Sequence, residues 1–245
     1  MARRRKRHVQ QELRFSKRGG KRRGAGRPKK GVRASERHEK RPKLAPRFPV
    51  HVIVRVEQDV GSLRTAHAYH AIRRALETSK ARVDFRVVEI SLQRQHIHLV
   101  AEAANEIALA RGMQSLQISA ARHLNAAISK AQRKRRKGRV FVDRYHARIL
   151  KTPSEVRRVL NYVMNNWRHH REDHGMESMF WDVDYFSSGA RFRGWKEPLP
   201  ALDPRYQPLE MCAADTWLLR VGWARAGPIS MYAVPGRDCY EGRER

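Results

Sequence analysis

Two histidines separated by one residue, His96 and His98, are the side chains in this sequence best spaced for chemistry. They lie in the apolar run QHIHLV at residues 95–100, which favours a β-strand. Side chains alternate between the faces of a strand. Both imidazoles therefore project from one face, about 7 Å apart, while Ile97 points into a core. Such a pair can hold one divalent metal ion if another element supplies a third ligand. Taken alone, it also fits two exposed histidines on a basic surface.

The elements that must position this pair follow from the hydrophobic pattern. Strands are predicted at residues 48–56, 82–92, 96–103 and 140–150, and helices at 61–79, 107–131 and from 153 onward. Residues 93–95 are too few for anything except a tight turn, so the second and third strands form a hairpin. The order is β-α-β-β-α-β with one further helix. It predicts an α+β, ferredoxin-like antiparallel sheet with helices on one face.

The helix that follows residue 152 has the clearest signals in the chain. Thr152 and Glu155 form a capping box around a proline at the first helical position. Tyr162 and Asn166 are i and i+4 neighbours on one flank of the apolar face, where they can face a cleft. The apolar face itself recurs at helical spacing and consists of Val156, Val159, Leu160, Val163 and Trp167.

The charge of the chain indicates a polyanionic partner. The 245 residues carry a net charge of +29, and residues 1–46 hold 19 Lys and Arg against 3 Glu. This segment is too polar to fold alone, so we expect a disordered basic tail. Nucleic acid is the default partner of such a protein. No apolar run is long enough for a membrane span, and no secretory signal or cysteine framework is present. These features predict a cytoplasmic, nucleoid-associated protein.

Two basic stretches are candidates for contact with nucleic acid. Residues 23–30 (RGAGRPKK) resemble an AT-hook that would place Arg27 in an A·T-rich minor groove. The match is short, and a solvated basic tail that binds phosphates without preference also explains it. Residues 130–139 hold seven Lys and Arg and are predicted to track a phosphate backbone. The DNA-binding candidates are Arg27, Lys134, Arg135, Arg136, Lys137, Arg139 and Arg144.

The motifs together resemble the HUH single-tyrosine (Y1) transposases of the IS200-like kind, and in particular their relatives associated with repeated extragenic palindromes. The resemblance rests on His96-Ile97-His98, on the stretch VFVDRYH at residues 140–146, and on LNYVMNN at residues 160–166. It covers residues 47–172. Gln95 departs from the Asn that often precedes the first histidine in that family.

The resemblance implies a catalytic role for the tyrosine helix. Tyr162 would be the nucleophile, and His96, His98 and Asn166 would hold Mg²⁺ or Mn²⁺, with His170 as a substitute ligand. The implied reaction is cleavage and rejoining of single-stranded or hairpin DNA through a 5′-phosphotyrosine, by a monomer or a homodimer. Tyr145 is the rival tyrosine, interpreted as packing or DNA contact.

Two other functions remain open at the level of sequence. One is a non-catalytic nucleic-acid-binding protein on the same sheet, although such sheets display stacking aromatics where this strand offers His96 and His98. The other is a degenerate transposase relative. The predicted organisation is a basic tail (1–46), a catalytic domain (47–172) and a C-terminal extension (173–245) that packs on the domain or trails it.

Overall fold

A computed structural model describes residues 41–175 and 178–236 of the chain. The chain divides into two units, residues 1–35 and 36–245, and every described residue belongs to the second. The stretch that resembles an AT-hook, with Arg27, lies outside the described residues. The elements are β1 (Val50–Arg55), α1 (Ala66–Lys80), β2 (Phe85–Leu92), β3 (His96–Ala103), α2 (Glu106–Gln132), β4 (His146–Ile149), α3 (Pro153–His169) and α4 (Trp217–Arg220), joined by loops and short 3₁₀ turns.

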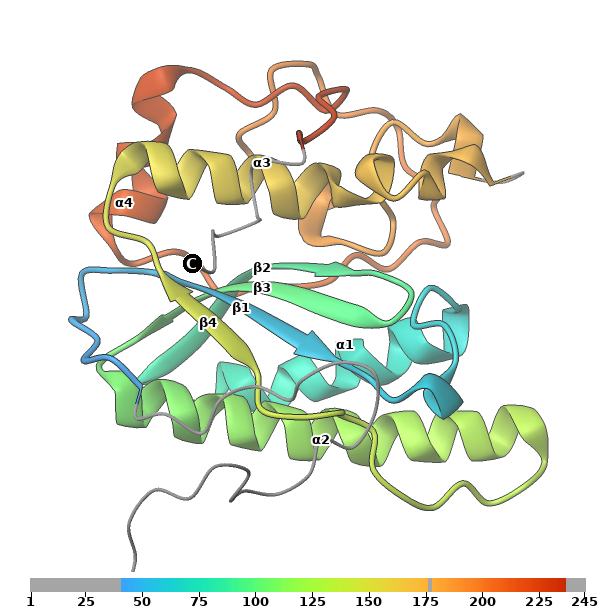
Figure 1. The fold of residues 1–245 in the computed structure, drawn as a ribbon. Helices are drawn as coiled ribbons and strands as arrows, with labels where there is room; N and C mark the ends of the chain where they lie inside the picture. Colours follow the sequence, from blue (N-terminus) through green and yellow to red (C-terminus); the bar gives the residue numbers. More distant parts are fainter. Residues whose placement is uncertain (1–40, 176–177, 237–245) are drawn as a thin grey trace, which may run out of the picture. The chain divides into compact units, whose positions relative to one another are not determined.

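The four strands form one sheet in the order β2-β3-β1-β4, and all neighbouring strands are antiparallel. This is the ferredoxin-like arrangement that the element order predicts. Helices α1 and α2 cover one face of the sheet, and α3 lies over the opposite face (Figure 1). Both faces of the central strands are therefore covered. On β3, apolar side chains face α1 and α2, and the two histidines face α3.

Alternation along β1 decides which residues enter which core. Val50, Val52 and Val54 point to the cluster under α1 and α2, while Ile53 points to the α3 side. A second cluster forms beneath α3 and includes Val100 of β3. The predicted apolar face of α3 is confirmed, since Val156, Val159, Leu160, Val163 and Trp167 are all buried.

Four predicted elements are shorter in the structure than in the sequence interpretation. The first strand, predicted over residues 48–56, is Val50–Arg55, and the second, predicted over 82–92, is Phe85–Leu92. The fourth strand was predicted over residues 140–150, but only His146–Ile149 is strand, with one isolated bridge from Phe141 to Val56. The Asp143 carboxylate accepts a hydrogen bond from the Arg144 N–H, a local bond that competes with strand pairing. The first helix begins at Ala66 rather than at Gly61, because Gly61 has φ +77° and ends a 3₁₀ turn.

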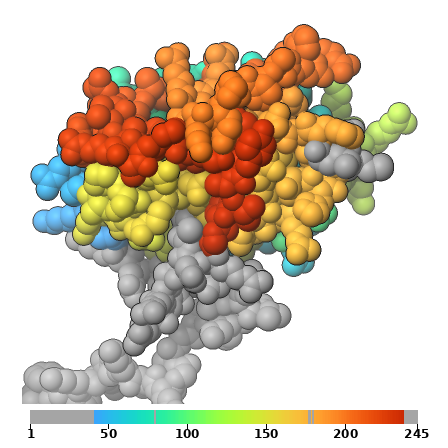
Figure 2. Space-filling view, turned by 90° about the horizontal axis from the view of Figure 1, so that it is seen from above, coloured from blue at the N-terminus to red at the C-terminus, as the bar shows by residue number. Residues whose placement is uncertain are grey.

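Residues 178–236 pack against α3 and complete its burial. Figure 2 shows this orange and red segment spread over the face that carries the yellow α3. Phe192, Leu218 and Trp223 join the second cluster. Arg157 donates to the backbone carbonyls of residues 227 and 228, and Arg168 donates to that of residue 231. The segment thereby holds α3 along both its apolar and its polar sides. None of the described helices is long and apolar enough to cross a membrane.

The contact between α2 and β2 predicts a packing effect at Gly112. A Cβ at this position would collide with the ring of Phe85, which is 1% exposed. Gly112→Ala gains about 1 kcal/mol of helix propensity but overpacks the core by up to about 3 kcal/mol. We expect a net loss of about 2 kcal/mol in the free energy of unfolding, measured by urea denaturation. The neighbouring exposed change Arg111→Ala is the control, and equal stability of both variants would contradict the prediction.

Candidate active site

The two histidines lie on the face of β3 that α3 covers. Ile97 and Leu99 point to the opposite core, so the alternation predicted from sequence holds on this strand. His98 is 2% exposed and His96 is partly buried. Their ring centroids are 4.7 Å apart with planes nearly perpendicular, at 82°. The pair is thus a compact buried cluster rather than two histidines on an open surface.

Helix α3 brings three polar side chains over this pair. The ring of Tyr162 meets His98 edge to face, with centroids 5.2 Å apart. The ring of His170, which caps the helix, lies 5.6 Å from His96. Residues 162, 166 and 170 follow one another at intervals of four and share one side of the helix. Asn166 lies midway between the two contacts on that side of the helix.

The amide of Asn166 is buried without a hydrogen-bond partner. Its side chain is fully buried, yet neither Oδ1 nor Nδ2 finds a partner among the described residues. A buried amide normally satisfies its polar atoms, because leaving them unpaired costs about 1–3 kcal/mol. An unpaired amide on the helix side that contacts both imidazoles fits a site for a bound group.

Burial keeps the histidines of this cluster neutral. It lowers the pKa of His96 from 6.5 to about 4, with further contributions from the nearby charges of His170 and Arg55. The pKa of His98 is also well below its usual value, mainly because of burial. Burial likewise lowers the pKa of His170. Neutral imidazoles have a free lone pair, so the rings are in the state that binds a metal ion.

A metal ion at this site would need a third ligand that is not His, Cys, Asp or Glu. Within residues 41–175 and 178–236, no group of three or more His, Cys, Asp and Glu side chains is arranged to hold an ion. The buried amide of Asn166 falls outside those types and is the candidate for a third ligand. Two imidazoles and one amide oxygen form a mixed donor set that suits Mn²⁺ and also accepts Mg²⁺.

An open hollow of about 510 Å³ adjoins the cluster. Its lining includes His96, His170 and the turn between β2 and β3, together with Gly61, Ser62 and Glu172. Gln93 in this turn is 1% exposed, donates to Ser91 Oγ, and has an Oε1 atom with no partner among the described residues. The hollow gives a ligand a route from solvent to His96.

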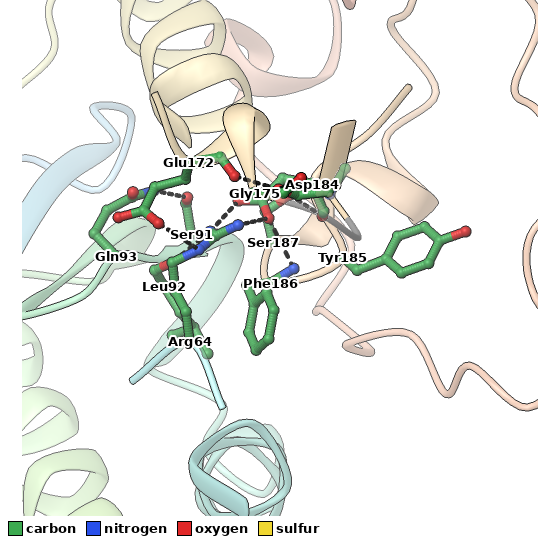
Figure 3. A network of polar contacts seen from close by, with 12 residues as sticks. Arg64, Ser91, Leu92, Gln93, Glu172, Gly175, Asp184, Tyr185, Phe186 and Ser187 are labelled. Atoms are coloured by element: carbon green, nitrogen blue, oxygen red, sulfur yellow. Dashed lines mark hydrogen bonds and ion pairs between the residues drawn. The ribbon is translucent and has the colours of Figure 1, made fainter. Parts of the chain in front are cut away.

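A charged network fixes the chain that follows α3 beside this hollow. Figure 3 shows Arg64 reaching toward both Asp184 and Glu172. Its guanidinium lies 2.9 Å from an Asp184 oxygen and 3.7 Å from Glu172, and it donates to the carbonyl of Leu92. Arg94 also approaches Glu172, at 3.9 Å. The network ties the end of the tyrosine helix to the hairpin that carries His96.

The rival tyrosine lies on the other side of the sheet. Tyr145 belongs to the cluster under α1 and α2, whereas Tyr162 belongs to the cluster under α3. Burial raises the pKa of Tyr145, and the guanidinium of Arg41 lies 3.7 Å from its ring centre. The sheet separates Tyr145 from His96 and His98, so its place is consistent with packing.

The basic candidates differ in how far their side chains are exposed. Lys134, Arg135 and Lys137 are exposed. Arg136 instead folds inward, with a side chain 7% exposed that pairs with Asp59 at 2.8 Å and also contacts Asn125. Two members are intermediate cases: Arg139 is exposed but pairs with Glu57, and Arg144 is partly buried. The loop lies near the end of β1, because Glu57 follows that strand by two residues.

Sequence reasoning missed three residues of this site. His51 of β1 stacks on His98, Arg55 of β1 lies directly across the strand pair from His96, and Gln93 lines the hollow. A histidine inside an otherwise apolar strand was a signal for His51. The pairing register of β1 and β3, which brings His51 and Arg55 to the site, is not readable from either strand alone.

A family match covers the stretch of the chain that contains the two histidines and Tyr162. Residues 46–166 match the family described as "Transposase IS200 like", a segment that contains both histidines and ends at Asn166. This segment of the chain belongs to the IS200-like transposase family. A solved structure described as "Structure of the REP associates tyrosine transposase bound to a REP hairpin" is 13% identical, with a TM-score of 0.49, and the match covers 74% of this chain and all of that one. No match is found among curated proteins.

The buried imidazoles predict acid sensitivity of the metal-free fold. Burial lowers the pKa of His51 to about 3 and that of His96 to about 4, against 6.5 in the unfolded chain. Between about pH 6.5 and 4 the unfolded state binds more protons, so the free energy of unfolding falls as the pH drops. For His51, which is fully buried, the slope reaches about 1.4 kcal/mol per pH unit.

Urea denaturation in EDTA across this pH range measures the slope. His51→Phe should flatten it by removing one titrating group. A free energy of unfolding that is constant from pH 6.5 to 4 in the wild type would contradict the prediction.

Proposed function

We propose that this protein cleaves and rejoins single-stranded DNA, with Tyr162 as the nucleophile. The observation that carries the proposal is the contact of the Tyr162 ring with His98, beside His96 and within one helical turn of Asn166. Membership of residues 46–166 in a transposase family supports DNA as the partner. The exposed cations of the basic loop and the net charge of +29 fit a phosphate backbone.

A divalent ion completes the proposed site. His96, His98 and Asn166 would hold Mg²⁺ or Mn²⁺, with His170 beside His96 as the substitute ligand. Such an ion, when bound, polarises the non-bridging oxygens of a phosphodiester and neutralises charge that develops on them. The unpaired amide of Asn166 and the neutral state of both imidazoles support these assignments.

The reaction exchanges one phosphoester for another. The Tyr162 oxygen attacks phosphorus and forms a 5′-phosphotyrosine while the bond from phosphorus to O3′ breaks. The phenol gives up its proton and the departing O3′ takes one up, which leaves a free 3′-OH. A 3′-OH from the same or another strand reverses the step. Since bond energy is conserved in the covalent intermediate, the cycle needs no nucleotide triphosphate.

The protein side chains supply position and a dry environment. Tyr162 is 8% exposed and held on a helix whose apolar face is fully packed, so its oxygen reaches the site without a large search in conformation. The hollow beside His96 would admit the strand, and the exposed Arg55 is the direct β1 partner of His96. A role as a sheet-surface binder that stacks bases is disfavoured, because α3 covers the face that would carry the aromatics.

Covalent trapping tests the nucleophile. Wild-type protein mixed with hairpin-bearing single-stranded DNA and Mn²⁺ should give a slowly migrating protein–DNA band after denaturation. Tyr162→Phe removes the attacking oxygen and should lose the band, and EDTA should lose it as well. Tyr145→Phe is the matched control and should keep it. A band that survives in Tyr162→Phe would assign the chemistry elsewhere.

The exposed part of the basic loop should set the salt dependence of DNA binding. Replacing Lys134, Arg135 and Lys137 by alanine removes three phosphate contacts, so the slope of log K against log salt should fall by about two. Arg136→Ala should leave the slope unchanged and instead lower the melting temperature, because its guanidinium pairs with Asp59. Fluorescence anisotropy across salt concentrations measures the slope. Identical slopes for the triple variant and wild type would contradict this role.

A further inference from the structure

His51 and His98 form an unusual buried pair of imidazoles. His51 Nε2 lies 3.1 Å from His98 Nδ1, a hydrogen-bonding distance. Their rings are stacked, with centroids 5.2 Å apart and planes only 9° from parallel. His51 is fully buried and His98 is 2% exposed. The strand register explains the contact, because Val100 and Ile53 are the direct partners of His51 and His98, which makes the two histidines diagonal neighbours.

This contact decides which nitrogen of His98 remains for a ligand. One nitrogen of the pair must donate and the other must accept. Since Nδ1 of His98 is engaged with His51, Nε2 is the nitrogen available to a metal ion. It carries a lone pair only if the proton of His98 is on Nδ1. The opposite arrangement, in which His51 donates, would place a proton on Nε2 and block coordination.

We propose that His51 is a positioning residue for the metal site: it accepts a hydrogen bond from His98 Nδ1–H and thereby keeps the lone pair of His98 Nε2 available. The inference rests on the proposed metal-binding role of His98 and adds to it a residue that does not touch the ion. Ligating histidines commonly give their second N–H to an acceptor that fixes tautomer and ring orientation. Here the acceptor is another imidazole.

A neutral acceptor suits this position. A carboxylate would perform the same task, but a second charge buried beneath the helix would need its own partner. An imidazole accepts the hydrogen bond without adding charge. The hydrogen bond to His51 also restricts rotation of the His98 ring, which Tyr162 and His96 border on other sides. The orientation of His98 is thus set from three directions.

The experiment compares Mn²⁺ affinity in the full chain without DNA, by isothermal titration calorimetry. His51→Phe keeps a flat ring but removes the acceptor, and it should weaken Mn²⁺ binding by about 10- to 100-fold. His51→Gln retains an acceptor oxygen and should recover part of that loss. His146→Phe is the matched control, a histidine on the same sheet face opposite Ile53, and should bind Mn²⁺ as the wild type does.

A second measurement needs no metal and no variant. In metal-free wild-type protein labelled with ¹⁵N-histidine, long-range ¹⁵N–¹H correlation spectra should show a protonated Nδ1 and an unprotonated Nε2 for His98. A proton on Nε2 would overturn the inference even if His51→Phe failed to fold.

The two levels of the proposal fail differently. Equal Mn²⁺ affinity in wild type and His51→Phe would overturn the role of His51 and leave the metal site standing. A wild type that binds no Mn²⁺ would overturn the metal site and this inference together. A wild type that binds Mn²⁺ but forms no covalent product with DNA would overturn the proposed reaction and leave the role of His51 standing.

Discussion

The alternation of side chains along β3 is the constraint on which the site depends. This strand lies inside the sheet with both faces covered, so its apolar and polar residues must separate by face. Ile97 and Leu99 enter the core under α1 and α2, and a shift of one residue would bury the histidines there instead. The hydrophobic effect on one face therefore fixes the position of the imidazoles on the other. The position of His96 and His98 is a consequence of how their apolar neighbours pack.

Apolar packing also fixes the orientation of α3, the helix that carries Tyr162. Its capping box fixes where α3 begins, and its apolar face fixes the rotation about its axis. Given both, residues at intervals of four must form one stripe, and that stripe meets the histidines. Residues 178–236 hold the helix from outside, through the carbonyls that Arg157 and Arg168 bind. The extension thus contributes to the site without supplying a side chain to its centre.

The buried histidines are neutral, and the exposed surface of the described residues carries many cations. Burial keeps the imidazoles uncharged, whereas exposed cations such as Arg55 and Lys134 face solvent. A polyanion would be attracted by these cations at long range, and in the proposed reaction only one phosphate would need to approach the interior. In that dry interior a bound cation would act on the phosphate more strongly than in water. The arrangement fits a protein that binds many phosphates and acts on one.

The sequence by itself determined the element order, the shared face of His96 and His98, and the neighbouring positions of Tyr162 and Asn166. These follow from periods of 2 and 3.6, which are local properties of the chain. Only the tertiary structure decided that Tyr145 lies behind the sheet, that Arg136 folds onto Asp59, and that His51 and Arg55 join the site. Each of these depends on strand register or loop closure between residues distant in sequence. The fourth strand was predicted too long, because its pairing with β1 breaks after residue 142, where Asp143 makes a local side-chain hydrogen bond.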